Sequence, residues 1–211
     1  MSRLSSTDSK TDTKEQILNA AERHFALSGF AGTSLRALTR DAKVNLAAVH
    51  YHFGSKEELF KAVVRRVAEP IVEEQVRHLD ELERLNPNPS VMDIVEAFVA
   101  RPLEMIFQQR EASCYVHAQF VGRCRIEPRP IQELAEVEFD TGHQRFLELL
   151  HKTLPHQSRA ELEWKLDLIV AMIVRVLTQI EYSDSSSDQP SELIDDQIKR
   201  LVRFITSGIG A

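Results

Sequence analysis

Residues 45–51 place small and hydrogen-bonding side chains next to one another on a short predicted helix. His50 and Tyr51 can donate hydrogen bonds to phosphates or to base edges. Small side chains let a helix backbone come close to the bases, where an alanine methyl can meet the methyl group of thymine. This composition favours a helix in the major groove of DNA, with an exposed face formed by Asn45, Leu46, Ala47, Ala48, His50 and Tyr51.

Two further polar side chains lie where helices are predicted to begin. Thr33 precedes a short helix, and Lys56 opens a long one. The free backbone N–H groups and the positive end of the helix dipole favour a phosphate at such positions. We therefore expect phosphate contacts at both residues.

Four residues of the middle region have the types that bind metals, namely Cys114, His117, Cys124 and His143. Cys114 and His117 share a helix face, but no second pair follows at the spacing typical of zinc ligands. These residues are expected instead to be buried or to line a pocket. No metal and no other cofactor is predicted.

Motifs of catalysis and export are missing from the sequence. It has no phosphate-binding glycine loop, no serine nucleophile elbow and no zinc-protease motif. A helical enzyme acting on a lipid-like substrate would need a catalytic constellation, so the prediction is a protein that is not an enzyme. The N-terminal residues lack the apolar core of a secretion signal, and two cysteines fit a reducing compartment, so a cytoplasmic location is expected.

The periodic segments of the first half all have the helical repeat. A capping box at Thr13 opens the first helix, and Gly29 closes it. Asn45 can cap the third helix, and a capping box at Ser55 opens a long fourth helix. Pro70 is expected to kink this helix without ending it, because the periodicity continues beyond it.

The second half is also helical, with breaks at 86–89 and 128–130 and a kink near Pro102. The sequence therefore predicts an all-α protein of about nine helices without a sheet. It consists of an N-terminal three-helix helix-turn-helix domain and a C-terminal helical domain for ligand binding and dimerisation. The predicted division is a flexible arm at 1–12, the helix-turn-helix domain at 13–66 and the C-terminal domain at 67–211.

Charge is distributed unevenly between these two domains. The whole chain has 26 Lys and Arg residues and 32 Asp and Glu residues, a formal charge of −6. Residues 1–66 hold 11 of the basic residues and 7 of the acidic ones, so this segment is basic and the remainder acidic. A basic head on an acidic body suits a protein that touches phosphates with one end only.

The order of residues in the head resembles the DNA-binding domain of the TetR family of bacterial repressors. The resemblance covers residues 13 to about 66 and rests on Gly29-Phe30, on 33–38 (TSLRAL), on His52-Phe53 and on 55–59 (SKEEL). Family members commonly have Ser at the position of Asn45 and Tyr at that of His50, so the operator sequence cannot be transferred. The sequence of residues 45–56 (NLAAVHYHFGSK) is most similar to the PsrA-like, fatty-acid-responsive subgroup of this family.

This resemblance implies roles for individual residues of the head. Thr33, Tyr51 and Lys56 would anchor phosphates, and Arg36 would reach the DNA backbone or a base. The complete set of predicted DNA-binding residues is Thr33, Ser34, Arg36, Asn45, Leu46, Ala47, Ala48, His50, Tyr51 and Lys56.

For the C-terminal domain the resemblance implies a ligand pocket and a dimer interface. The middle region is first of all a core, but part of it would also line the pocket: Phe98, Met105, Cys114, His117, Phe120, Val121, Phe139, His143, Met172, Ile173 and Val176. Two apolar stripes can be core or can pair in a four-helix dimer interface. They comprise Leu162, Leu166, Ile169, Ile173, Val176, Ile180, Ile194, Ile198, Leu201 and Ile205.

The predicted function is that of a ligand-responsive repressor. A homodimer would bind double-stranded, pseudo-palindromic operator DNA, and a small apolar or acyl-type effector would release it. Two alternatives stay open at this point. One is a DNA-binding regulator or nucleoid-type protein that senses no ligand, and the other is an activator.

Overall fold

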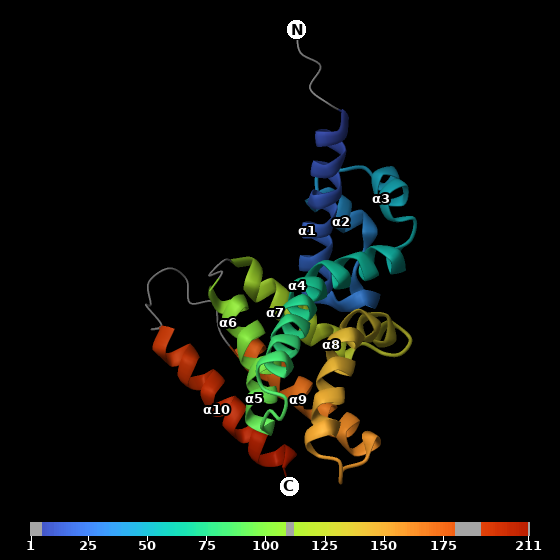
Figure 1. Cartoon of the computed structure of the whole chain (residues 1–211). Helices are drawn as coiled ribbons and strands as arrows, with labels where there is room; N and C mark the ends of the chain where they lie inside the picture. The colour runs from blue at the N-terminus through green and yellow to red at the C-terminus, as the bar shows by residue number, and fades with distance from the viewer. Residues whose placement is uncertain (1–5, 109–111, 180–190, 211) are drawn as a thin grey trace. The chain divides into compact units, whose positions relative to one another are not determined.

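The described residues of the computed structural model, 6–108, 112–179 and 191–210, form helices and connecting loops (Figure 1). They contain nine helical segments when α5, η1 and α6 are taken as one continuous helix, and no strand, as predicted. The elements are α1 Ser6–Gly32, α2 Leu35–Asp41, α3 Leu46–Phe53, α4 Lys56–Leu85, α5 Val91–Val95, the π-helical turn η1 Glu96–Ala100, α6 Arg101–Gln108, α7 Ala112–Ile126, α8 Ile131–Thr153, α9 Arg159–Gln179 and α10 Ser191–Ile209.

Two compact units make up the chain. Unit 1 consists of Met1–Val67 together with Val116–Glu136, and unit 2 of Ala68–Tyr115 together with Val137–Ala211. The first break falls next to the predicted boundary at 66/67, but unit 1 also contains a segment from the middle of the chain. Another difference lies at the N-terminus, where α1 begins at Ser6, within the segment predicted as an arm.

Aromatic rings from three helices form the core of unit 1. Phe25 of α1 and Phe60 of α4 meet edge to face, with ring centroids 5.2 Å apart. Phe120 of α7 lies 5.7 Å from the Phe60 ring, and Phe30 lies 5.5 Å from it on another side. Each such pair contributes roughly 0.5–1.5 kcal/mol beyond the burial of its surface. The cluster therefore fixes α7 to α1 and α4.

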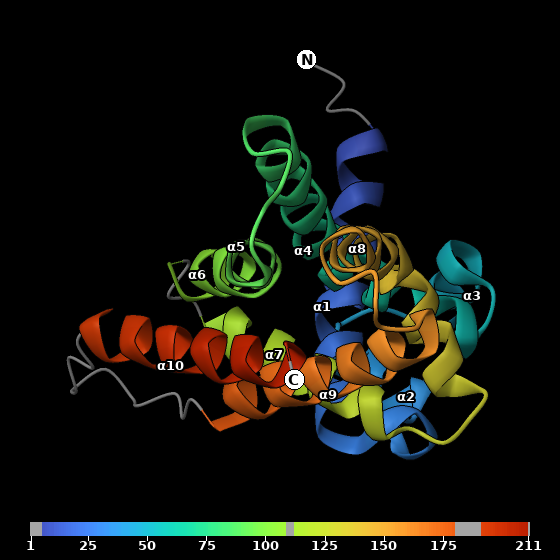
Figure 2. The same ribbon diagram turned by 60° about the horizontal axis from the view of Figure 1, so that its bottom comes forward.

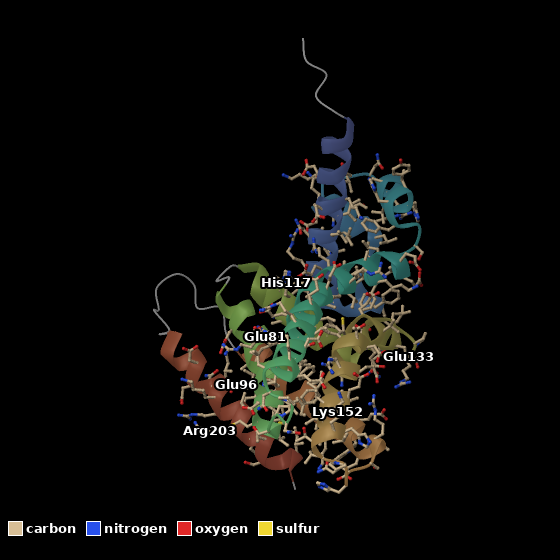
Figure 3. All side chains as sticks on the ribbon, viewed as in Figure 1. Glu81, Glu96, His117, Glu133, Lys152 and Arg203 are labelled. Atoms are coloured by element: carbon tan, nitrogen blue, oxygen red, sulfur yellow. The ribbon has the colours of Figure 1, made fainter. Side chains whose placement is uncertain are left out.

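A buried charged group joins the same three helices. The Glu22 carboxylate of α1 is only 3% exposed, and it pairs with the Arg66 guanidinium of α4. His117 of α7, labelled in Figure 3, places Nε2 3.3 Å from Glu22 Oε1. Burial lowers the pKa of His117, with a smaller contribution in the same direction from Arg66, while Glu22 opposes the shift. A buried carboxylate needs such partners, because an unpaired charge is costly to remove from water.

In unit 2, the α5 helix begins at Ser90 with a reciprocal capping box. Asp93 N–H donates to Ser90 Oγ at 3.2 Å, and Ser90 N–H donates to Asp93 Oδ2 at 2.9 Å. The helix then widens into η1 directly before Pro102. The predicted kink near this proline is thus a π-helical turn. At Pro70, by contrast, α4 continues as one helix to Leu85.

Gln75 of α4 compensates for a donor that Pro102 lacks. Proline has no N–H, so Pro102 cannot donate to a carbonyl of the preceding turn. In this turn Gln75 Nε2 donates to the Phe98 carbonyl at 3.2 Å, and the Gln75 residue is 6% exposed. Gly142 of α8 permits the arrangement, since a Cβ there would lie 2.5 Å from Gln75 Oε1.

Helix α10 packs against α5, η1, α6 and α9 within unit 2 (Figure 2). The apolar stripes of α9 and α10 provide much of this packing. Their buried members are Leu162, Leu166, Ile169, Ile198, Leu201 and Ile205, none more than 9% exposed. No helix in the described part of the chain is long and apolar enough to cross a membrane.

We predict that Gly142→Ala destabilises the protein. The added methyl group would overlap Gln75 Oε1, so either α8 or the Gln75–Phe98 hydrogen bond must shift. We expect a loss of about 1–3 kcal/mol in the free energy of unfolding, measured by urea denaturation at fixed protein concentration.

Gly208→Ala is the matched control, because nothing lies within 4 Å of a Cβ at this helical position of α10. This change should be neutral or should stabilise the protein by up to about 1 kcal/mol. Equal stabilities of the Gly142→Ala variant and the parent would show that the close approach of Gln75 is no constraint.

Candidate DNA-binding surface

A tight turn joins α2 to α3 and sets their mutual angle. Lys43 has a left-handed φ of 56°, and the following Val44 N–H donates to Thr39 O at 3.0 Å. Leu38 of α2 and Val49 of α3 are both fully buried beneath this turn. The two helices are thereby held as a helix-turn-helix, in which α2 supports α3 from behind.

The outer face of α3 is exposed. Leu46, Ala47, His50 and Tyr51 are exposed, and Ala47 and Tyr51 lie on the side opposite Val49, with Tyr51 72% exposed. Asn45 caps the helix, since its side-chain oxygen accepts the Ala48 N–H at 2.8 Å. The predicted set Asn45, Leu46, Ala47, His50 and Tyr51 is therefore brought together on one exposed surface, with Ala48 at its half-buried edge.

The His50 ring is held in a defined orientation. Its Nδ1 lies 2.9 Å from the Gly54 carbonyl oxygen, one turn later at the end of α3. A carbonyl accepts only, so Nδ1 carries the hydrogen. In the neutral ring Nε2 is then a hydrogen-bond acceptor that faces away from this contact.

Thr33, which was predicted to contact a phosphate, is buried beside this exposed surface. The residue is 4% exposed, and its hydroxyl oxygen lies 2.7 Å from Gly29 O and 3.0 Å from His24 O. Its backbone N–H donates to Phe30 O at 3.3 Å. Both donors are used to close the end of α1. The neighbouring Ser34 is exposed and makes no side-chain hydrogen bond as the N-cap of α2.

Lys56 opens α4 beside the aromatic cluster. Its ammonium lies 4.6 Å from the centroid of the Phe30 ring. Desolvation lowers the pKa of Lys56, while the nearby carboxylates of Glu57 and Glu127 act in the opposite direction. Exposed Arg36 adds a second cation from α2. The surface thus combines fixed small side chains with cations, as phosphate-anchored base contacts require.

Residues predicted for the ligand pocket fall in both units. His117, Phe120 and Val121 lie in unit 1, where His117 pairs with Glu22 and Phe120 packs on Phe60. The others with described side chains lie in unit 2: Phe98, Phe139, His143, Met172, Ile173 and Val176. The side chains of Met105, Cys114 and Ile194, and all of Ile180, lie outside the described residues. Among the described residues, no three His, Cys, Asp or Glu side chains form a group that could hold a metal.

Glu127 was not singled out by its sequence, although it contacts the head. Its Oε1 accepts the Phe30 N–H at 2.9 Å and the Arg123 Nε–H at 3.2 Å. Glu127 directly follows the end of α7, where the helix dipole disfavours a negative charge. A carboxylate at this unfavourable position needs partners outside the helix dipole, and this is the one indication that the sequence offers of a role for Glu127.

A helix with an exposed face of small residues, packed against a second helix behind it, is typical of helix-turn-helix transcription regulators. Matches to family models indicate the same class of protein. Residues 17–63 match the model of bacterial regulatory proteins of the tetR family, and residues 96–208 match the tetracyclin repressor-like C-terminal domain. Because the second match alone covers more than half of the chain, the protein belongs to the TetR family. Homodimers and ligand binding are typical of this family.

Individual relatives support the same assignment. The chain is 29% identical over 143 residues to the transcriptional dual regulator CecR of Shigella flexneri, an alignment that covers 67% of this chain and 60% of CecR. Its fold is similar to that of the TetR family member SCO3833 of Streptomyces coelicolor A3, with a TM-score of 0.60, 19% identity and coverage of 91% and 90%. It is also similar to FadR of Bacillus subtilis in complex with stearoyl-CoA, with a TM-score of 0.66, 12% identity and coverage of 92% and 98%.

We predict that Asn45→Ala destabilises the protein by about 1 kcal/mol. The substitution leaves the Ala48 N–H of α3 without its side-chain acceptor. The midpoint of urea denaturation reports the change.

Ser34→Ala is the matched control, because Ser34 occupies the N-cap of α2 without a side-chain hydrogen bond. It should change the stability by less than about 0.5 kcal/mol. If both variants lose the same stability, the Asn45 cap has no special role.

Proposed function

We propose that this protein is a cytoplasmic, ligand-responsive repressor that binds operator DNA as a homodimer. The observation that carries the proposal is the exposed face of α3, with Val49 fully buried behind it. A twofold dimer would place two such helices one DNA turn apart, at roughly 34–36 Å, so the operator should be pseudo-palindromic.

The DNA contacts divide into those that read bases and those that anchor the backbone. Leu46, Ala47 and His50 face the groove in this proposal, and Asn45 lies at the start of the same helix. Tyr51 and Lys56 anchor phosphates, with Ser34 and Arg36 available at the start of α2. Base contacts give sequence preference, whereas phosphate contacts give the salt dependence of the affinity.

The dimer interface is assigned to the exposed faces of α9 and α10. Most of the predicted stripe residues are already buried within one chain, so they are available to a partner only in part. Large apolar side chains remain exposed beside them: Trp164 at 62% and Leu168 at 44% on α9, and Phe204 at 70% on α10. Trp164 and Leu168 lie one turn apart on the same side of their helix. Aromatic anchors of this kind dominate the energy of protein interfaces.

The effector is proposed to be apolar or acyl-type and to bind in unit 2. Phe98 and Phe146 stack there with centroids 4.2 Å apart, and the His143 ring lies 6.1 Å from Phe98. The similarity in fold to a FadR that was solved with stearoyl-CoA supports the same class of ligand. A tight complex with a small polar compound, and none with an acyl compound, would contradict this assignment.

Release of DNA requires that the effector prefer one spacing of the two heads. A ligand with equal affinity for both states shifts nothing. Helix α4 is the proposed lever, since it runs from Lys56 in unit 1 to Leu85 in unit 2. A coupling of about 1–3 kcal/mol would change the operator affinity by roughly 5- to 150-fold.

We predict that the protein binds DNA from upstream of its own gene more tightly than random DNA, at two chains per site. Lys56→Ala should weaken binding to all sequences. It should also lower the slope of log affinity against log salt by about 1.8, because one phosphate contact worth about 0.9 is lost in each of the two heads. Titration of labelled DNA at several salt concentrations measures both quantities.

Lys152→Ala serves as the control, because it removes the same charge from unit 2, where Lys152, labelled in Figure 3, pairs with Glu83 of α4. Its salt slope should equal that of the parent. An unchanged slope in the Lys56→Ala variant would exclude the phosphate role of Lys56, and equal affinity for all DNA would favour a nucleoid-type protein.

We predict that Trp164→Asp combined with Phe204→Asp shifts the protein from dimer to monomer. A carboxylate placed in the apolar centre of an interface loses its water without gaining a partner. Sedimentation equilibrium should show a dissociation constant raised by at least about 100-fold, which corresponds to roughly 2.7 kcal/mol.

Val137→Asp on α8 is the control, because Val137 is also a large apolar residue of unit 2 and is 70% exposed. This variant should remain as dimeric as the parent. A dimer that survives the double substitution would place the interface on other surfaces.

A further inference from the structure

The Glu127 carboxylate is a buried charge inside the DNA-binding unit. The residue is 6% exposed, although it follows the last residue of α7 and precedes a proline. Oε1 accepts two hydrogen bonds, from the Phe30 backbone at 2.9 Å and from Arg123 at 3.2 Å. The first of these bonds joins residues 97 positions apart in the chain. Hydrogen bonds to a charged acceptor are roughly twice as strong as neutral ones.

The end of α1 is shaped to receive this carboxylate. Gly29 has φ 69° and ψ 179°, a conformation that side chains rarely adopt. A Cβ at Gly29 would lie 2.4 Å from Glu127 Oε1 and 2.6 Å from the Arg123 guanidinium. Glycine is thus required both by the backbone turn and by the approach of α7. The turn presents the Phe30 N–H to the carboxylate.

Phe30 connects the carboxylate to the start of α4. Its ring stacks on Phe25 and meets Phe60 edge to face, so its position is fixed. The Lys56 ammonium lies over the same ring, 4.6 Å from its centroid. Glu127 also attracts this ammonium through space. One carboxylate therefore acts on Lys56 by two routes, through the Phe30 ring and through its charge.

We propose that Glu127 is a positioning residue for DNA binding, which holds the turn at Gly29 and Phe30 and thereby fixes the phosphate-anchoring ammonium of Lys56. This inference rests on the proposed phosphate role of Lys56. The proposal means that a residue directly after α7 helps to form the surface that binds DNA, although α7 lies outside the helix-turn-helix. The required ligand is one phosphate of the DNA backbone, held by a lysine whose location the protein sets in advance.

A double-mutant cycle tests the proposal with the full-length protein. The variants are Glu127→Gln, Lys56→Ala and both together, and the measured quantities are the operator affinity and its salt slope. Glutamine keeps an acceptor for the Phe30 N–H but removes the charge. We expect Glu127→Gln alone to weaken operator binding about threefold to tenfold and to lower the salt slope. In the Lys56→Ala background the same change should alter the affinity less than about twofold, because effects that act through one contact are not additive.

If Glu127 acted only through its negative charge on the DNA, the opposite result would be expected, so the two explanations can be distinguished. Removal of a negative charge from a DNA-binding unit should strengthen binding to a polyanion. Glu133→Gln is the matched control, since Glu133 of α8 lies in the same unit and its side chain is 50% exposed beside Arg129 (Figure 3). This control should bind DNA as tightly as the parent or more tightly. Stronger binding by Glu127→Gln, or effects of Glu127→Gln and Lys56→Ala that add, would overturn the proposal.

A second variant covers the case in which Glu127→Gln does not fold. Phe30→Leu keeps the backbone N–H and an apolar side chain but removes the aromatic face beneath Lys56. It should lower the salt slope in the parent and leave it unchanged in the Lys56→Ala background. Failure of the underlying function is recognised separately, because then Lys56→Ala alone leaves the salt slope unchanged or the parent binds no DNA.

Discussion

The rings of Phe25, Phe60 and Phe120 bring together three helices that are far apart in the sequence. Their contacts decide which part of the chain belongs to the DNA-binding unit, because Phe120 draws the second half of α7 against α1 and α4. The polar contacts depend on this packing. Glu22 and His117 meet, and Glu127 reaches the Phe30 N–H, only because α7 is held at that distance. The apolar packing therefore places two buried carboxylates, those of Glu22 and Glu127, beside cationic and N–H groups.

The helix-turn-helix itself is a small structure with a small core. Leu38 and Val49 are its fully buried centre, and the left-handed Lys43 closes the turn between the two helices. Such a unit exposes much of its surface and is stabilised only modestly by its own packing. The aromatic cluster behind it supplies additional burial. Helix α3 can therefore keep small, exposed residues on its outer face without losing its position.

Local features of this fold could be predicted from the sequence, whereas contacts between distant residues could not. The side-chain caps at Asn45 and Ser55 follow from residue type and spacing, and the structure confirms them. Gly29 interrupts the helical backbone with φ 69°, although α1 extends to Gly32 and does not end at Gly29 as predicted. Thr33 was assigned to phosphate because it precedes a helix N-terminus, and its hydroxyl is hydrogen-bonded to carbonyls of α1. An apolar stripe predicts burial without naming the partner, so Leu162 and Ile198 could be core or interface. Glu127 contacts a backbone group 97 residues away, and no local pattern encodes that pairing.

The DNA-binding unit is assembled from two separate stretches of chain, Met1–Val67 and Val116–Glu136. A fragment that ends near residue 67 would expose the Phe60 ring to water and leave the Phe30 N–H without its acceptor. A single recombination event between two related genes would therefore join a head to an α7 that was not shaped for it. Substitutions on the exposed outer face of α3, by contrast, leave this shared core unchanged. The architecture thus favours divergence by point substitution over the shuffling of whole heads.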